Sequence, residues 1–166
     1  MNNVAGAIIT MDPIVMLDCA GDQNGQVQYD ITYESGFANP PSIIIVDGMG
    51  LPVANGSLVA GDYCLTILDD NDCLAGEFCF EVVEPDPIIV SVTPTNMTCD
   101  DGGTIILSVT GGTGDYTYDW ADVVGDNDDA NRTNLAAGEY TVTVYDTNDC
   151  STIVDDIVIG LSLIHI

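Results

Sequence analysis

An internal repeat constrains the fold of this chain more than any other feature. The string LVAGDYCLTILDDNDC, which ends at Cys73, aligns without a gap with LAAGEYTVTVYDTNDC, which ends at Cys150, at an offset of 150 − 73 = 77 residues. Near the start of each copy, Cys19 matches Cys99. Copies of about 75 residues are long enough to bury a small core each. The repeat therefore predicts two small domains in tandem.

The ends of the two copies set their limits. Asp12-Pro13 matches Asp86-Pro87, which places repeat 1 at residues 12–84 and repeat 2 at residues 85–160. The stretch GAIITMDPIV resembles FEVVEPDPII at the junction. Residues 1–11 are therefore expected to form a strand like the end of a preceding repeat, or a strand donated to a neighbouring subunit. Residues 161–166 (LSLIHI) lack the acidic character of the rest, and we assign them no function.

Within each copy, apolar side chains recur at every second position. Tyr140, Val142 and Val144, for example, alternate with Thr141 and Thr143. A period of two with β-branched and aromatic residues is typical of strands that have one buried face. Clusters of Gly, Asp and Asn separate these runs, and we find no helical period. The chain is thus predicted to be all-β, with each copy a small β-sandwich.

The charge of the chain excludes two classes of partner. Against 27 Asp and Glu stands a single Lys or Arg, Arg132, so the net charge is −26. Nucleic acids and anionic membrane surfaces both require several cations on the protein, and no segment is apolar enough for insertion into a membrane. With 46% hydrophobic residues, the chain is nevertheless expected to fold.

Two motifs in the second copy resemble a known family. GGTGDYTYDW, followed by NLAAGEYTVTVYDTNDC, is similar to the SprB-type repeat of gliding-motility-associated surface adhesins. The similarity covers copy two from Cys99 to Ile159, whereas copy one keeps only its two ends. Copy two departs from the family at Gly114-Asp115, where Pro is usual, and at Asp149, where Gly is usual. The resemblance implies two tandem immunoglobulin-like modules in a large protein that the type IX system secretes to the cell surface.

Six cysteines in a chain of this kind favour an oxidising, extracellular location. Equivalence between the repeats pairs the first cysteine of each copy with the last. Two further cysteines occur only in copy one, and the alternation places both on the solvent face of its last hairpin. Because six cysteines allow 15 connectivities, free thiols stay an alternative, and a zinc site is less favoured without a Cys-x2-Cys pair. The bonds expected are Cys19–Cys73, Cys99–Cys150 and Cys64–Cys79.

The Asp-rich turns offer oxygen ligands of the kind that calcium prefers. No segment fits the twelve-residue EF-hand loop, and at this density of acids a merely solvated acidic rim is the alternative. The sequence establishes no cofactor, and calcium is the one that these turns could bind. The candidate ligands are Asp69, Asp70, Asp72, Asp146, Asp149, Asp126, Asp128 and Asp129.

Catalysis has little support, because a nucleophile triad needs a base and the only His lies in the C-terminal hexapeptide. We expect a non-enzymatic structural or adhesive module that acts as a disulfide-stabilised acidic spacer in an extracellular repeat array. Its partners would be neighbouring repeats or like subunits, which it contacts through strand addition. One alternative is a subunit of an extracellular filament assembled by strand donation. Another is a carbohydrate-binding accessory module, in which Trp120 stacks on a surface glycan.

Overall fold

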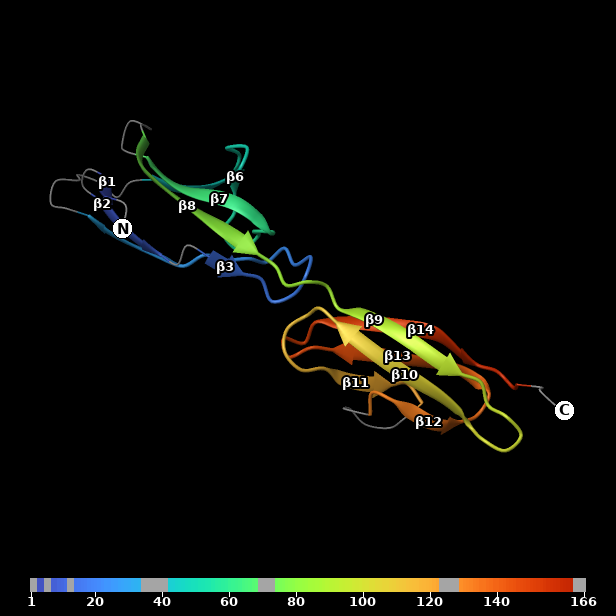
Figure 1. The fold of residues 1–166 in the computed structure, drawn as a ribbon. Coiled ribbons are helices and arrows are strands. Elements are labelled where there is room, and N and C mark those ends of the chain that lie inside the picture. Colours follow the sequence, from blue (N-terminus) through green and yellow to red (C-terminus); the bar gives the residue numbers. More distant parts are fainter. Residues whose placement is uncertain are drawn as a thin grey trace. The chain divides into compact units, whose positions relative to one another are not determined.

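Strands make up all of the regular structure in the described part of the chain. The structure, a computed structural model, describes residues 3–4, 7–11, 14–33, 42–68, 74–122 and 129–162. The chain divides into two compact units, unit 1 (Met1–Pro85) and unit 2 (Asp86–Ile166). Each unit is an immunoglobulin-like β-sandwich, so the predicted fold class is confirmed (Figure 1).

Unit 1 contains a five-stranded sheet of order β3-β8-β7-β5-β6 and a three-stranded sheet of order β1-β2-β4. β3 runs parallel to β8, with Ile14 opposite Glu81 and Met16 opposite Val83. The other strand pairs of this unit are antiparallel. The strands are β1 (Asn3–Val4), β2 (Ala7–Met11), β3 (Ile14–Met16), β4 (Tyr29–Tyr33), β5 (Ser42–Asp47), β6 (Pro52–Val53), β7 (Gly61–Leu68) and β8 (Leu74–Val83).

Unit 2 contains two three-stranded antiparallel sheets, of orders β12-β10-β9 and β11-β13-β14. A parallel bridge between Met97 and Leu161 joins the segment after β9 to the segment after β14. The strands are β9 (Ile89–Thr95), β10 (Gly103–Thr110), β11 (Thr117–Trp120), β12 (Arg132–Leu135), β13 (Gly138–Tyr145) and β14 (Ser151–Ile159).

Alternating side chains from both sheets of a unit form its core. In unit 1, Leu65 and Ile67 of β7 belong to the same buried cluster as Ile9 of β2 in the facing sheet. In unit 2, Ile105 of β10 shares a buried cluster with Trp120 of β11. Each unit therefore buries a complete apolar core of its own, as expected of a small domain.

Residues 7–11 form a strand of unit 1, which corrects their assignment to a preceding repeat or to a neighbouring subunit. β2 pairs with β4 along its whole length, with Ile9 opposite Ile31. Ile9 is only 1% exposed and Met11 packs against the same core, whereas Thr10 is exposed. The alternation of apolar and polar side chains that predicts a strand here therefore also matches the burial of this segment in the core of unit 1.

The position of β2 also shifts the start of repeat 1. In unit 1 the N–H of Leu17 donates to the carbonyl of the last residue of β8, and in unit 2 the N–H of Met97 donates to the carbonyl of the residue after β14. Leu17 and Met97 therefore hold equivalent positions, which are 97 − 17 = 80 residues apart in the sequence. β2 precedes Leu17 as β9 precedes Met97. We conclude that β2 corresponds to β9 and belongs to repeat 1. Residues 12–13, whose sequence match with residues 86–87 set the predicted start of repeat 1, lie outside the described residues.

Candidate functional site

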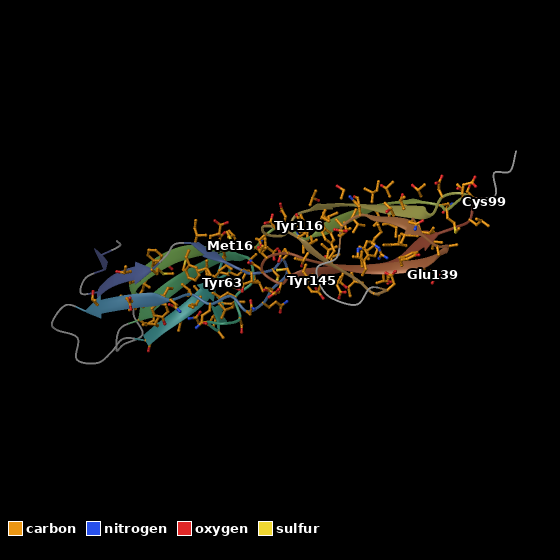
Figure 2. The ribbon with its side chains drawn as sticks, turned by 90° about the horizontal axis from the view of Figure 1, so that it is seen from below. Met16, Tyr63, Cys99, Tyr116, Glu139 and Tyr145 are labelled. Carbon is orange, nitrogen blue, oxygen red and sulfur yellow. A yellow bond between two sulfur atoms is a disulfide. The ribbon has the colours of Figure 1, made fainter. Side chains whose placement is uncertain are left out.

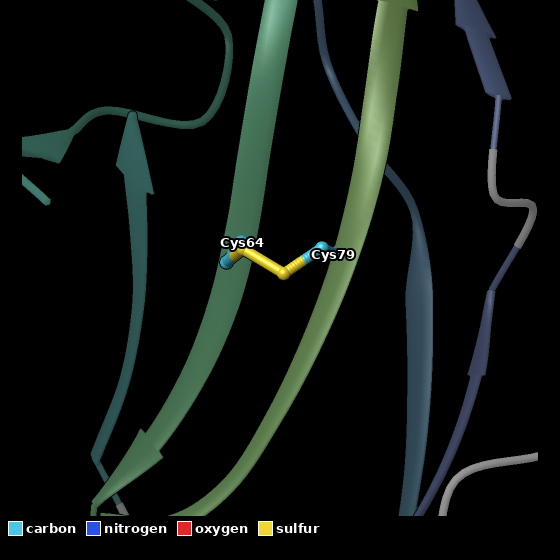
Figure 3. Close-up of a disulfide and its surroundings, with 2 residues drawn as sticks. All are labelled: Cys64 and Cys79. Carbon is cyan, nitrogen blue, oxygen red and sulfur yellow. A yellow bond between two sulfur atoms is a disulfide. The ribbon is translucent and has the colours of Figure 1, made fainter. Parts of the chain in front are cut away.

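A disulfide bond joins β7 and β8 on the outer face of unit 1. Cys64 and Cys79 are directly opposite each other in the strand register, with their Cα atoms 3.9 Å apart, and Figure 3 shows the bond between them. Their sequence neighbours Tyr63 and Phe80 point into the core, where the two rings stack with centroids 5.9 Å apart. The structure thus contains the bond that the alternation of these strands predicts.

Carboxylates surround this disulfide. Beside it lies a shallow recess of about 440 Å³, with Asp62 and Glu81 on its rim. The carboxylate of Glu77 lies within 4.8 Å of both cysteine sulfurs. Because these sulfurs are bonded to each other, they are not thiolates and do not ligate a metal. The negative charge around them disfavours the approach of an anionic thiolate, which is the species that reduces disulfides.

Cys99 and Cys150 lie at opposite ends of unit 2, which corrects the bond predicted between them. Cys150 directly precedes β14, whereas Cys99 follows Met97, which bridges Leu161 beyond the other end of that strand. A strand of this length spans roughly 30 Å, and a disulfide tolerates Cα separations of only about 7 Å. Figure 2 shows Cys99 at the end of unit 2 away from Tyr145, the last residue of β13. Cys99 is a free, exposed cysteine, and Cys150 is disulfide-bonded.

Cys19 occupies the same place in unit 1 that Cys99 occupies in unit 2. It lies two residues after Leu17, at the C-terminal end of β8. Nearby, the N–H of Gly21 donates to the carboxylate of Glu84. Cys19 is disulfide-bonded, while its predicted partner, Cys73, lies outside the described residues.

Asp146 is the one buried acidic side chain in the described residues, with 4% of its surface exposed. Its Oδ1 accepts hydrogen bonds from the N–H groups of Asn148 (2.9 Å) and Cys150 (3.0 Å). Its Oδ2 accepts from the N–H (2.9 Å) and the hydroxyl (3.1 Å) of Thr113. Burial by itself raises the pKa of Asp146, but these four hydrogen bonds outweigh burial and lower the pKa below its ordinary value.

These hydrogen bonds correct the assignment of Asp146 as a calcium ligand. A carboxylate has about four acceptor positions, and donors from the protein occupy all of them here. Asp149 in the same turn is exposed, as is Asp129. In the parts of the chain that the structure describes, the one cluster with metal-ligand spacing is the disulfide pair with Glu77. The remaining candidates, Asp69, Asp70, Asp72, Asp126 and Asp128, lie outside the described residues.

Trp120 is fully buried, as is usual for an aromatic side chain in such a strand, so its ring is not exposed for stacking on a sugar. Its Nε1–H donates to the carbonyl of Asp129 (3.0 Å), and the guanidinium of Arg132 lies 5.1 Å from the centroid of its ring. Arg132 also donates to both carboxylate oxygens of Asp122, at 2.9 and 3.0 Å. This hydrogen bonding and the positive charge lower the pKa of Asp122. The only Arg of the chain therefore covers the core of unit 2.

Three asparagines whose role the sequence did not reveal join segments that lie far apart in the sequence. Asn55 donates through Nδ2 to the carbonyl of Val27 and accepts from its N–H through Oδ1, each at 2.9 Å. Asn131 accepts from the N–H of Leu107 in β10, and Asn96 accepts from the N–H of the residue after β14. Asn is common in turns, so composition alone does not separate these three from the other asparagines.

The fold and these sites define a tandem immunoglobulin-like protein, a class whose modules are typically non-catalytic. Residues 91–125, from β9 to beyond β11, match the family model of the SprB repeat, which confirms the resemblance seen in the sequence. SprB repeats belong to surface adhesins, so this match and the disulfide bonds indicate a non-catalytic module of an extracellular surface protein. No curated protein matches the chain.

Two kinds of solved structure are similar to this chain. The four N-terminal Ig domains of Dscam1 isoform 8.4 share 13% identity with a TM-score of 0.36, over 95% of this chain and 41% of that one. The fibronectin(III)-like modules of CbhA from Clostridium thermocellum share 13% identity with a TM-score of 0.33, over 95% and 97%. The chain thus spans less than half the length of the Dscam1 structure. Within the described ranges, no helix is long and apolar enough to span a membrane.

Proposed function

We propose that this chain is a non-enzymatic spacer of an extracellular bacterial surface protein, in which acidic, disulfide-stabilised modules follow one another in a repeat array. The observation that carries the proposal is that two equivalent modules each have their own core and the same charge. Residues 1–85 contain 13 acidic residues and no Lys or Arg, and residues 86–166 contain 14 acidic residues and Arg132. Each module therefore carries a charge of −13.

Equal charge on every module has a direct physical consequence. Modules of like charge repel one another within about a Debye length, roughly 10 Å at 0.1 M salt. This repulsion opposes collapse of an array and association between arrays. The charge of each module thus supports a role as a spacer that keeps neighbouring modules apart, rather than the binding of a small molecule.

Light scattering on the purified chain, with its disulfide bonds intact and its free thiols alkylated, tests this proposal. We expect a monomer whose second virial coefficient is positive at low salt and falls towards zero as salt is added, because counterions screen the repulsion. Attraction or self-association at low salt would contradict a spacer. The reading frame that encodes the chain gives a second test: further copies of the module support an array, whereas an adjoining catalytic domain would make these copies accessory modules.

Two observations disfavour the alternative functions, a filament subunit and a carbohydrate-binding module. Strand donation needs a strand without a partner in its own unit, and β2 pairs with β4. Glycan stacking on Trp120 needs an exposed ring, and this ring is buried. Calcium stays a proposal for the acidic loops, with Asp69, Asp70, Asp72, Asp126, Asp128, Asp129 and Asp149 as the candidate ligands.

A further inference from the structure

The recess beside the disulfide of unit 1 is mostly apolar. Its volume is about 440 Å³, and the turn between β5 and β6 borders it at Gly48. Met49 and Leu51 in that turn are 82% and 57% exposed. The Oδ1 atom of Asp47 accepts from the N–H groups of both residues at 2.9 Å, so the turn is ordered. Exposed apolar side chains around a recess with a polar rim are typical of a surface that binds a partner.

Two carboxylates face each other at the rim of this recess. Asp62 of β7 is directly opposite Glu81 of β8, and both side chains are exposed. Like charges in directly opposite positions destabilise a sheet, and residues 1–85 contain no Lys or Arg that could offset the pair. In unit 2 the repeat offset of 77 equates Asp62 with Glu139, which is opposite Val158. The fold therefore does not require the acidic pair, and an unfavourable local arrangement of this kind is typical of a functional site.

The charges of the rim decide which partner fits the recess. A Lys or Arg side chain between Asp62 and Glu81 would offset their repulsion, and apolar side chains next to it would cover the recess and the exposed turn. A second copy of this chain does not offer such a segment. The chain has no Lys, and its one Arg, Arg132, donates to both carboxylate oxygens of Asp122. The charges therefore favour a different protein as the partner.

We propose that the recess of unit 1 binds a segment of a different protein in which one Lys or Arg is flanked by apolar side chains. The cationic group lies between Asp62 and Glu81, and the apolar side chains cover the disulfide and the turn that contains Met49. This interaction goes beyond the spacer function, because it gives unit 1 a partner that unit 2 does not share.

A titration of the ¹⁵N-labelled full chain with a capped peptide, followed by amide chemical shifts, tests the proposal. The peptide carries one Arg between two Leu, and a salt concentration of about 0.15 M screens its attraction to the other acids of the chain. We expect shifts confined to the amides of residues 47–51, 61–64 and 79–82. A peptide with citrulline in place of Arg should bind about 5-fold more weakly or worse, as should one with Gly in place of both Leu.

Three variants that each remove one negative charge separate this site from general attraction. Asp62→Asn and Glu81→Gln should each weaken binding by about 3- to 5-fold. Neither should lower the melting temperature of unit 1, because each relieves the opposed pair. Glu139→Gln, the matched change in unit 2, should leave the affinity unchanged. Equal effects of the three variants would overturn the proposal, as would shifts spread over both units, no shifts at all, or equal binding of either control peptide.

Discussion

Asp146 stabilises the turn between β13 and β14 of unit 2 through four hydrogen bonds. In Asp146→Asn, one oxygen becomes an amide group that donates, so two of these donors lose their acceptor. Hydrogen bonds to charged groups contribute about 1.5–3 kcal/mol each, and the loss of two is expected to lower the free energy of unfolding of unit 2 by about 3–6 kcal/mol. Urea unfolding followed by the fluorescence of Trp120, the only Trp of the chain, measures this change.

Asp149 provides the matched control in the same turn. It is exposed and has a φ of 62°, a conformation that Asn also tolerates. Asp149→Asn should therefore change the free energy of unfolding by less than about 0.5 kcal/mol. Equal losses in the two variants would show that the charge of the turn matters and the hydrogen bonds of Asp146 do not.

The lowered pKa of Asp146 predicts how the stability of unit 2 depends on pH. Because the folded-state pKa lies below the ordinary value, the ionised carboxylate stabilises unit 2 fully above the unfolded pKa of about 3.9. That contribution is lost as the pH falls through the folded-state pKa. The difference in unfolding free energy between wild type and Asp146→Asn should thus shrink between about pH 5 and pH 2. A difference that stays constant over this range would contradict the assignment.

The role of Asp146 could not be predicted from the sequence. The spacing of acids in its turn indicated a metal ligand, but half of its hydrogen bonds come from Thr113, which lies 33 residues away. Only the folded chain brings these two residues together. The same limit applies to Cys99, because the similarity of the two copies does not show at which end of a module each cysteine lies.

At the scale of elements, the Cys64–Cys79 bond fixes the hairpin of β7 and β8. It links residues 15 apart in the sequence, and a loop of about 15 residues corresponds to roughly 3 kcal/mol in the chain-entropy model. Cys64→Ser/Cys79→Ser should lower the free energy of unfolding of unit 1 by about that amount. Calorimetry should show the transition of unit 1 shifted. The transition of unit 2, which the fluorescence of Trp120 identifies, should be unchanged. Cys99→Ser, which removes a free thiol, should shift neither transition.

The strand β2 provides a second test at this scale. Ile9→Ala removes a fully buried side chain and should destabilise unit 1 by about 2–4 kcal/mol. Thr10→Ala, at the exposed position next to it, should cost less than about 0.5 kcal/mol. Calorimetric unfolding measures both changes, with the transition of unit 2 as internal reference. If the two variants were equally stable, β2 would not be part of the folded unit.

Strands were easier to predict from the sequence than their grouping into modules. Alternation placed Tyr63, Leu65 and Ile67 in the core correctly, because period-two burial is a local property. Residues 7–11 were also predicted as a strand but were assigned to the wrong repeat. The module to which β2 belongs depends on its pairing with β4, whose residues lie 18 to 26 positions later, and the match of a short Asp-Pro motif was not enough to predict it.

For the whole molecule, the net charge of −26 predicts a strong dependence of stability on ions. Repulsion within each unit destabilises the compact state, and screening relieves it, so sodium chloride should raise the melting temperatures of both units. Calcium at matched ionic strength should raise them further if the acidic loops outside the described residues hold an ion. Coincident melts in calcium, magnesium and sodium chloride would leave these loops as solvated surface and would end the calcium proposal.

The parallel pairing of β3 with β8 has a mechanical consequence. When the two ends of unit 1 are pulled apart and β2 has peeled from β4, β3 and β8 are drawn along each other in opposite directions. Their three register pairs and the hydrogen bond from Leu17 then bear the load together in shear, whereas an antiparallel hairpin opens one bond at a time. Among the described residues of unit 2 the corresponding clamp is the Met97–Leu161 bridge, with two hydrogen bonds at Met97. Unit 2 is therefore expected to yield first under tension, and the chain releases its length in two steps of rising force.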